Sequence, residues 1–139
     1  MAIHVEWDNP EKTIIRFDFA GKWNWYGYEM AVGEAFGMME GMRHIVDFIF
    51  NLTDSDSLPE GATLYIKRTL ELSPNPSTVI VIASGDPSCE ALVTLFARIY
   101  KKLGERLMSV KSVEKARALY DEPAPAAPKP SPIRLIAAR

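Results

Sequence analysis

The chain has 139 residues, 47% of them hydrophobic and 24% charged, which is the composition of a globular domain in solution. A formal net charge of −2 argues against a nucleic-acid-binding module, because such modules need a basic surface to neutralise phosphates. One cysteine excludes an internal disulfide and a cysteine-based metal cluster. Because no apolar run approaches the roughly 20 residues of a membrane span and the first residues do not resemble a signal peptide, we expect a cytoplasmic protein.

The first elements in chain order are predicted to be two strands and a helix. Residues 3–7 alternate apolar and polar side chains, a turn-forming stretch follows at 8–12, and residues 13–19 alternate again. This pattern predicts an antiparallel hairpin. A helix is expected at about 25–41, with Asn24 as its cap.

The helix expected at 25–41 is apolar on more than one side. One stripe at spacings of three and four should face the core. A second set of apolar or small residues lies away from that stripe or just before the helix: Trp23, Tyr26, Met30, Gly33, Gly37 and Met38. Two interpretations stay open. The set is covered by the chain's own tail or by loose side chains, or it is the interface of a homodimer or the site of an apolar ligand.

A short apolar run at residues 44–52 is expected to be the central strand of the sheet, covered on both faces. A polar stretch follows it. Ser57 and Glu60 have the spacing of a capping box, and Pro59 suits the first turn of a helix. These signals predict a second helix at about 59–72.

Two further strands and two helices complete the domain. Residues 78–83 are β-branched without alternation, which is typical of a buried parallel strand, and Asp86 and Pro87 have the residue types of a helix cap and first turn. A short strand at 107–111 and a helix from Ser112 to about 120 follow. The predicted fold class is α/β: a single domain at residues 1–120 in the order ββαβαβαβα, with about four helices and a mixed sheet of about five strands that starts with the antiparallel hairpin.

Residues 121–139 are expected to be a tail, because they contain five of the ten prolines of the chain. The tail ends in an apolar segment around Ile133, Leu135 and Ile136. We expect this segment to dock on its own domain or on a second copy. The alternative is a solvated tail that contributes nothing to stability or assembly.

Five features together resemble the STAS-like family, which includes bacterial anti-sigma factor antagonists, and in particular the branch grouped with Sec14-like lipid-binding domains. They are the hairpin, the segments 21–25 and 57–62 that lead into helices, the strand 46–51, and the strand, loop and helix from residue 79. The resemblance covers about residues 3–120. It implies a non-enzymatic interaction domain that sometimes binds a nucleotide or an apolar ligand. In the antagonists the partner-facing loop carries Asp-Ser-Ser-Gly with a phosphorylatable serine, whereas residues 54–57 here are Asp-Ser-Asp-Ser.

The candidate site lies where the strands 44–52 and 78–83 end, because ligands gather at the carboxyl ends of strands in open α/β sheets. Its predicted residues are Thr53, Asp54, Ser55, Asp56 and Ser57 after one strand, and Ser84, Asp86 and Ser88 after the other. We expect a protein partner or a small apolar or anionic ligand at these loops. Ser55 and Ser57 either accept a phosphate or serve as plain helix caps, and the neighbouring aspartates oppose the phosphate.

An alternative uses Asp54, Asp56 and Asp86 as ligands of Mg²⁺ in a phosphoryl-transfer enzyme, similar to the haloacid-dehalogenase-type phosphatases. Other catalytic arrangements lack residues: two histidines provide no paired metal ligands, and no glycine-rich phosphate loop is present. Cys89, in the first turn of a predicted helix, is interpreted as structural. We therefore expect a non-enzymatic regulatory module without a cofactor.

Overall fold

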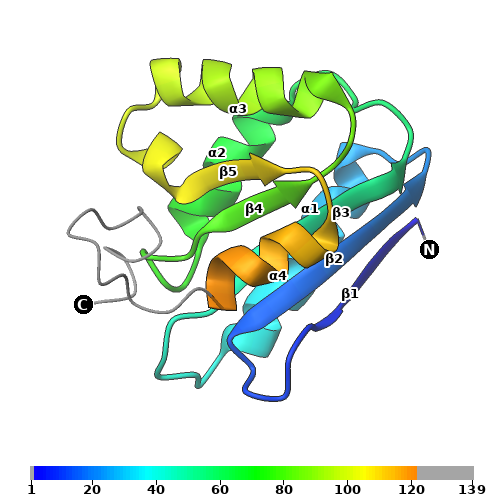
Figure 1. Cartoon of the computed structure of the whole chain (residues 1–139). Helices are drawn as coiled ribbons and strands as arrows, with labels where there is room; N and C mark the ends of the chain where they lie inside the picture. The colour runs from blue at the N-terminus through cyan, green and yellow to red at the C-terminus, as the bar shows by residue number, and fades with distance from the viewer. Residues whose placement is uncertain (1, 122–139) are drawn as a thin grey trace.

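Five strands lie side by side in the order in which they occur along the chain (Figure 1). The structure is a computed structural model that describes residues 2–121. The first strand, β1 (Ile3–Trp7), pairs antiparallel with β2 (Ile14–Gly21). Parallel pairing then continues through β3 (Asp47–Ser55), β4 (Ile80–Ala83) and β5 (Leu107–Val110). The predicted α/β class, the mixed sheet with its hairpin, and the element order are confirmed.

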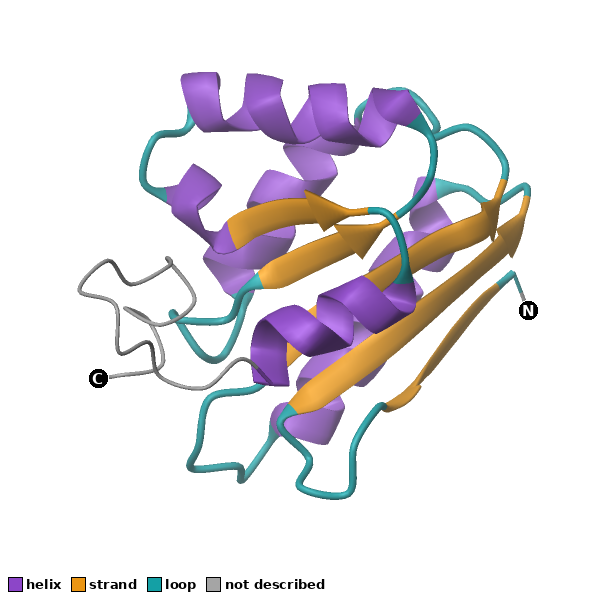
Figure 2. Cartoon of the chain, viewed as in Figure 1, coloured by secondary structure: helices purple, strands orange, loops and turns teal. Residues whose placement is uncertain are grey.

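Three of the four helices cover one face of the sheet. They are α1 (Trp25–Met39), α2 (Ala62–Leu72) and α3 (Pro87–Ile99), and each lies in the connection between two consecutive parallel strands. A short 3₁₀ helix (Leu103–Arg106) precedes β5. The last helix, α4 (Val113–Asp121), crosses the opposite face, at the front of Figure 2.

The two faces of the sheet carry different cores. Toward α1, α2 and α3, the strands contribute rings that pack closely, with 4.8 Å between the ring centroids of Phe17 and Phe50. Toward α4, a smaller cluster contains Ile14, Ile49, Val79, Val81 and Ala116. Because β4 is covered on both sides, its sequence has no polar alternation.

An ion network ties α4 to the hairpin. The carboxylate of Asp8, almost fully buried at 2% exposure, accepts hydrogen bonds from Arg117 Nη2 at 2.7 Å and from Arg16 Nη1 at 2.5 Å. Arg16 also pairs with Asp18, at 2.9 Å, and with Glu6. Two basic groups therefore compensate the one carboxylate that the turn between β1 and β2 buries.

The end of α4 is fixed to the sheet by Tyr120. Its hydroxyl donates to the backbone carbonyls of Phe48 at 2.9 Å and Val79 at 3.0 Å. These carbonyls lie at the amino-terminal ends of β3 and β4. Helix α4 therefore ends near the amino-terminal ends of β3 and β4, whereas the candidate site was predicted at their carboxyl ends.

The central strand lies further along the chain than predicted. It was expected at 44–52 and runs from Asp47 to Ser55, because it stays paired with β2: Gly21 lies opposite Ser55, and Asp56 N donates to Gly21 O at 2.9 Å. Thr53, Asp54 and Ser55 were predicted in a loop and are strand residues.

The capping box predicted for the second helix was wrong. Helix α2 begins at Ala62, after Gly61 with φ +96°, and no side chain caps it. Trp25 Nε1 donates to the Glu60 carbonyl at 2.6 Å, and a Cβ at Gly61 would lie 3.7 Å from the same indole nitrogen. This contact keeps Glu60 out of the helix, and the positive φ suits glycine.

The apolar set predicted around the first helix is only partly exposed. Tyr26 and Met30 are exposed, at 75% and 55%, as are Gly33 and Gly37, and Met38 is half-buried. Trp23 is buried instead, because its ring packs on Phe19 with 4.8 Å between centroids. A homodimer or an apolar ligand on this surface stays a prediction.

Within residues 2–121, no helix has both the length and the apolar character that crossing a membrane requires. The tail predicted at 121–139, and its docking, lie outside the described residues except for Asp121.

We expect the ionisation of Asp8 to stabilise the domain. Burial raises the pKa of Asp8, but hydrogen bonds from Arg117 and Arg16 outweigh it, so the pKa lies below its ordinary value. The Asp8 carboxyl group therefore binds its proton more tightly in the unfolded chain than in the folded protein. The resulting stabilisation is present above about pH 4 and is lost as the pH falls through the lowered pKa. Asp8→Asn should reduce the free energy of unfolding at neutral pH by about 1–3 kcal/mol, measured by urea unfolding.

The difference between wild type and Asp8→Asn should shrink as the pH falls below about 4. The control is Asp54→Asn, which removes the same charge from an exposed position and should change stability by less than about 0.5 kcal/mol. An Asp8→Asn deficit that stays constant across this pH range would contradict the role of the ionised carboxylate.

Candidate functional site

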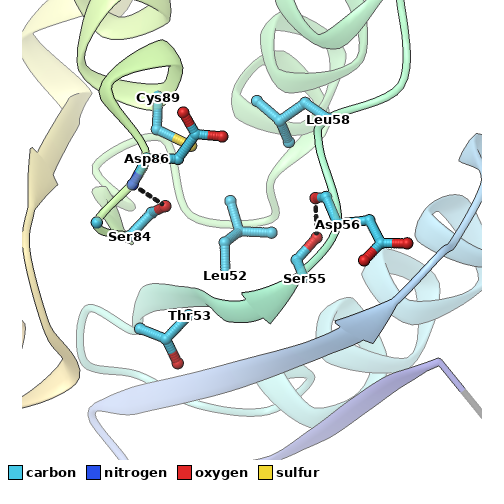
Figure 3. A pocket seen from close by; sticks show the side chains of 9 residues that line it. Leu52, Thr53, Ser55, Asp56, Leu58, Ser84, Asp86 and Cys89 are labelled. Atoms are coloured by element: carbon cyan, nitrogen blue, oxygen red, sulfur yellow. Dashed lines mark hydrogen bonds between the residues drawn. The ribbon is translucent and has the colours of Figure 1, made fainter.

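A cleft of about 330 Å³ opens at the carboxyl ends of β3 and β4, at the edge of the sheet where the site was predicted (Figure 3). The residues that line it come from the end of β3, the loop that follows, and the loop between β4 and α3. They are Leu52, Thr53, Ser55, Asp56, Leu58, Ser84, Gly85, Asp86 and Cys89.

The pairing of the strands positions the two walls. Asn51 lies opposite Ala83 in the register of β3 and β4, so the next residues are Leu52, within β3, and Ser84, directly after the end of β4. Leu52 points to the helix-covered side and lies in the middle of the cleft in Figure 3. The backbone amide of Ser84 donates to Val110 O at 2.9 Å, which attaches the start of this wall to β5.

The wall after β4 is a tight turn that leads into α3. Ser84 Oγ accepts from the Asp86 amide at 3.0 Å, and Asp86 Oδ1 accepts from the Ser88 amide at 2.9 Å. Asp86 therefore caps α3, with Pro87 in the first turn, and this prediction is confirmed. In Figure 3 the Asp86 carboxylate is turned across the cleft toward Leu58.

Hydrogen bonds also fix the wall after β3. Trp23 Nε1 donates to Ser55 Oγ at 2.7 Å, and Ser55 Oγ donates to the Asp56 carbonyl at 2.7 Å. The Thr53 side chain lies on the other side of β3 from Leu52 and donates to Asn51 Oδ1 at 2.7 Å (Figure 3). The Asp56 carboxylate is turned away from the middle of the cleft.

The buried thiol of Cys89 forms part of the cleft lining. Burial raises the pKa of this thiol, a hydrogen bond with Ser84 lowers it, the charge of Asp86 raises it, and the net shift is upward. The thiol is therefore protonated at neutral pH and is a poor nucleophile. This environment agrees with the interpretation of Cys89 as a structural residue.

The structure brings most of the predicted site residues together. Thr53, Ser55, Asp56, Ser84 and Asp86 line the cleft. A neighbouring, more open depression of about 500 Å³ shares Asp86 and is lined by the two other serines of the prediction, Ser57 and Ser88. Asp54 is exposed at the end of β3 and lines neither.

Sequence reasoning missed the apolar floor formed by Leu52, Leu58 and Cys89. The prediction rested on polar side chains, which define a site by their chemistry. A signal was present for both leucines: Leu52 continues the inward alternation of Phe48 and Phe50, and Leu58 is an apolar residue in a polar loop.

A small apolar cavity lies beneath this floor and shares Leu52 and Leu58 with the cleft. Its walls are mostly aromatic: Phe19, Trp23, Trp25, Tyr28 and Phe50, with Ile66 and Ile82. It has room for at most one water molecule, at about 10 Å³, and its lining offers that water no polar environment. The two leucines therefore separate a polar cleft from an aromatic core.

Among the described residues, no group of three or more histidine, cysteine or acidic side chains is placed to hold a metal ion. Asp54, Asp56 and Asp86 thus do not form the cluster that the phosphoryl-transfer alternative requires, although that alternative stays an untested hypothesis.

No protein-family model matches this chain, and no curated protein gives a significant sequence match.

We expect Cys89 to react slowly with iodoacetamide in the folded protein, with a rate that rises at alkaline pH. Asp86→Asn removes a charge that raises the thiol pKa, so alkylation should become several-fold faster. Ser84→Ala removes the hydrogen bond that lowers the pKa and should slow the reaction. Mass spectrometry of the alkylated protein measures both rates, and changes in the same direction would mean that access, not the thiol pKa, controls the reaction.

Proposed function

We propose that this protein is a non-enzymatic, STAS-like regulatory module that binds a small molecule in the cleft between the loops after β3 and β4. The observation that supports this proposal is the cleft itself, with an apolar floor and a rim of hydroxyl and carboxylate groups. Small-molecule sites typically enclose about 300–1,000 Å³ and combine apolar walls with a few placed polar groups. At about 330 Å³, the cleft suits a small ligand.

The polar rim is organised before any ligand arrives. Ser55 is held by Trp23, Ser84 by the Asp86 amide, and Asp86 by the Ser88 amide. A ligand that binds to groups already held in place does not have to order them, so less of its binding free energy is lost.

A bound ligand would contact Leu58, which belongs to the irregular segment between β3 and α2. The same segment carries exposed Ser57 and Glu60 on its outer side. Occupancy of the cleft can therefore change the surface that this loop presents to a protein partner. A single free thiol requires no oxidising compartment, so a cytoplasmic location belongs to the same proposal.

Blocking the cleft tests the proposal. A Cβ at Gly85 meets no atom within 4 Å, so Gly85→Phe should fold and fill the cleft. Lys115 is exposed on α4, on the opposite face of the sheet, so Lys115→Phe adds the same ring away from the cleft and is the control. In a thermal-shift screen of small molecules, we expect compounds that raise the Tm of wild type and Lys115→Phe but not of Gly85→Phe.

A screen in which every stabilising compound acts equally on Gly85→Phe would place binding elsewhere and contradict the proposal.

The non-enzymatic part has its own test, a panel of phosphatase and esterase substrates with Mg²⁺ present. Turnover that Asp54→Asn abolishes would overturn it in favour of the phosphoryl-transfer alternative.

A further inference from the structure

We infer that the cleft selects a ligand with an amine head on an apolar body. This inference rests on the proposed binding function and names the chemical class of its ligand. It follows from three properties of the cleft: which hydrogen-bonding groups are still free, the sign of its charge, and the position of its apolar floor.

Two hydroxyl donors near the cleft are already used within the protein. Ser55 Oγ donates to the Asp56 carbonyl, and the Thr53 hydroxyl, on the other side of β3, donates to Asn51. The Ser55 oxygen and the Asp86 carboxylate, which is turned across the cleft, still offer lone pairs to a ligand. A ligand that donates hydrogen bonds is complementary to such a rim.

The start of α3 does not offer the amides that usually bind an anion. Pro87 has no N–H, the Ser88 amide donates to Asp86 Oδ1, and the Cys89 amide donates to Asp86 O at 3.1 Å. The Asp86 amide donates to Ser84 Oγ. Since a helix N-terminus binds phosphate through free N–H groups, and these amides are occupied by the helix's own cap, they are not available to an anion.

The charge of the cleft points the same way. The Asp86 carboxylate is turned across it, the Asp56 carboxylate lies at its margin, and none of the residues that line it is basic. Asp86 Oδ1 is used by the Ser88 amide, whereas Oδ2 receives no hydrogen bond from the residues that the structure describes. An ammonium group can therefore donate to Oδ2 in a charge-assisted hydrogen bond, and the acidic rim attracts a cation.

The floor accounts for the apolar part of the ligand. Leu52, Leu58 and Cys89 are the apolar part of the lining, and in Figure 3 the Asp86 carboxylate and the Leu58 side chain face each other above Leu52. An amine that reaches Asp86 thus places its carbon skeleton over Leu52 and against Leu58.

The test uses three probes of one chain length, hexylamine, hexanoate and hexanol, titrated into isotopically labelled protein and followed by amide NMR shifts. We expect hexylamine to shift the amides of Gly85, Leu58 and Cys89, hexanol to do so more weakly, and hexanoate not at all. Asp86→Asn keeps the helix cap, because asparagine caps as well as aspartate, and should raise the Kd of hexylamine about tenfold or more.

Asp54→Asn is the matched control, because it removes the same charge from an acid outside the cleft and should leave the Kd unchanged. If hexanoate binds the cleft as tightly as hexylamine, or if Asp86→Asn does not weaken the amine, the amine inference is overturned while cleft binding stands. Both the inference and the proposed function fail under two joint conditions. Hexylamine shifts only amides outside the cleft, and every compound that raises the Tm of wild type raises the Tm of Gly85→Phe equally.

Discussion

The shared hand of the crossover connections determines most of this structure. Three consecutive crossovers, through α1, α2 and α3, step across the sheet in one direction, so all three helices lie on one face. That arrangement keeps β3 and β4 adjacent and brings the loops that follow them together at one edge. The cleft is therefore a consequence of the strand order, and its position needs no special sequence motif.

The two faces meet different physical demands. The helix-covered face buries a cluster of aromatic rings that continues up to Leu52 and Leu58. These two leucines also line the cleft, so its apolar floor is continuous with the core. On the other face, α4 covers β3 and β4, while the hairpin carries the Arg16 network. Asn51 Nδ2 donates to Asp18 at 2.8 Å and extends this polar array onto β3. The candidate cleft lies where the apolar core on the helix-covered face reaches solvent.

Local signals were predictable from the sequence, and long-range contacts were not. The cap of α3 at Asp86 and the buried strand around Val81 depend on near neighbours and on composition, and both were predicted. The start of α2 depends on a bond between Trp25 and Glu60, 35 residues apart, and the end of β3 depends on pairing with Gly21. The polar half of the site was therefore foreseen, but its floor at Leu58 required the packed core.

The bond between Asp8 and Arg117 joins residues 109 positions apart. A ribosome releases the hairpin first, and a nascent chain that ends before α4 already holds Asp8 and Arg16 but has no second guanidinium for the buried carboxylate. The second guanidinium reaches this carboxylate only when α4, the last described helix, has left the exit tunnel. Such distant pairings slow folding, because the chain must close a long loop before the contact contributes. The order of synthesis therefore leaves the Asp8 carboxylate with one of its two guanidinium partners until α4 has been made.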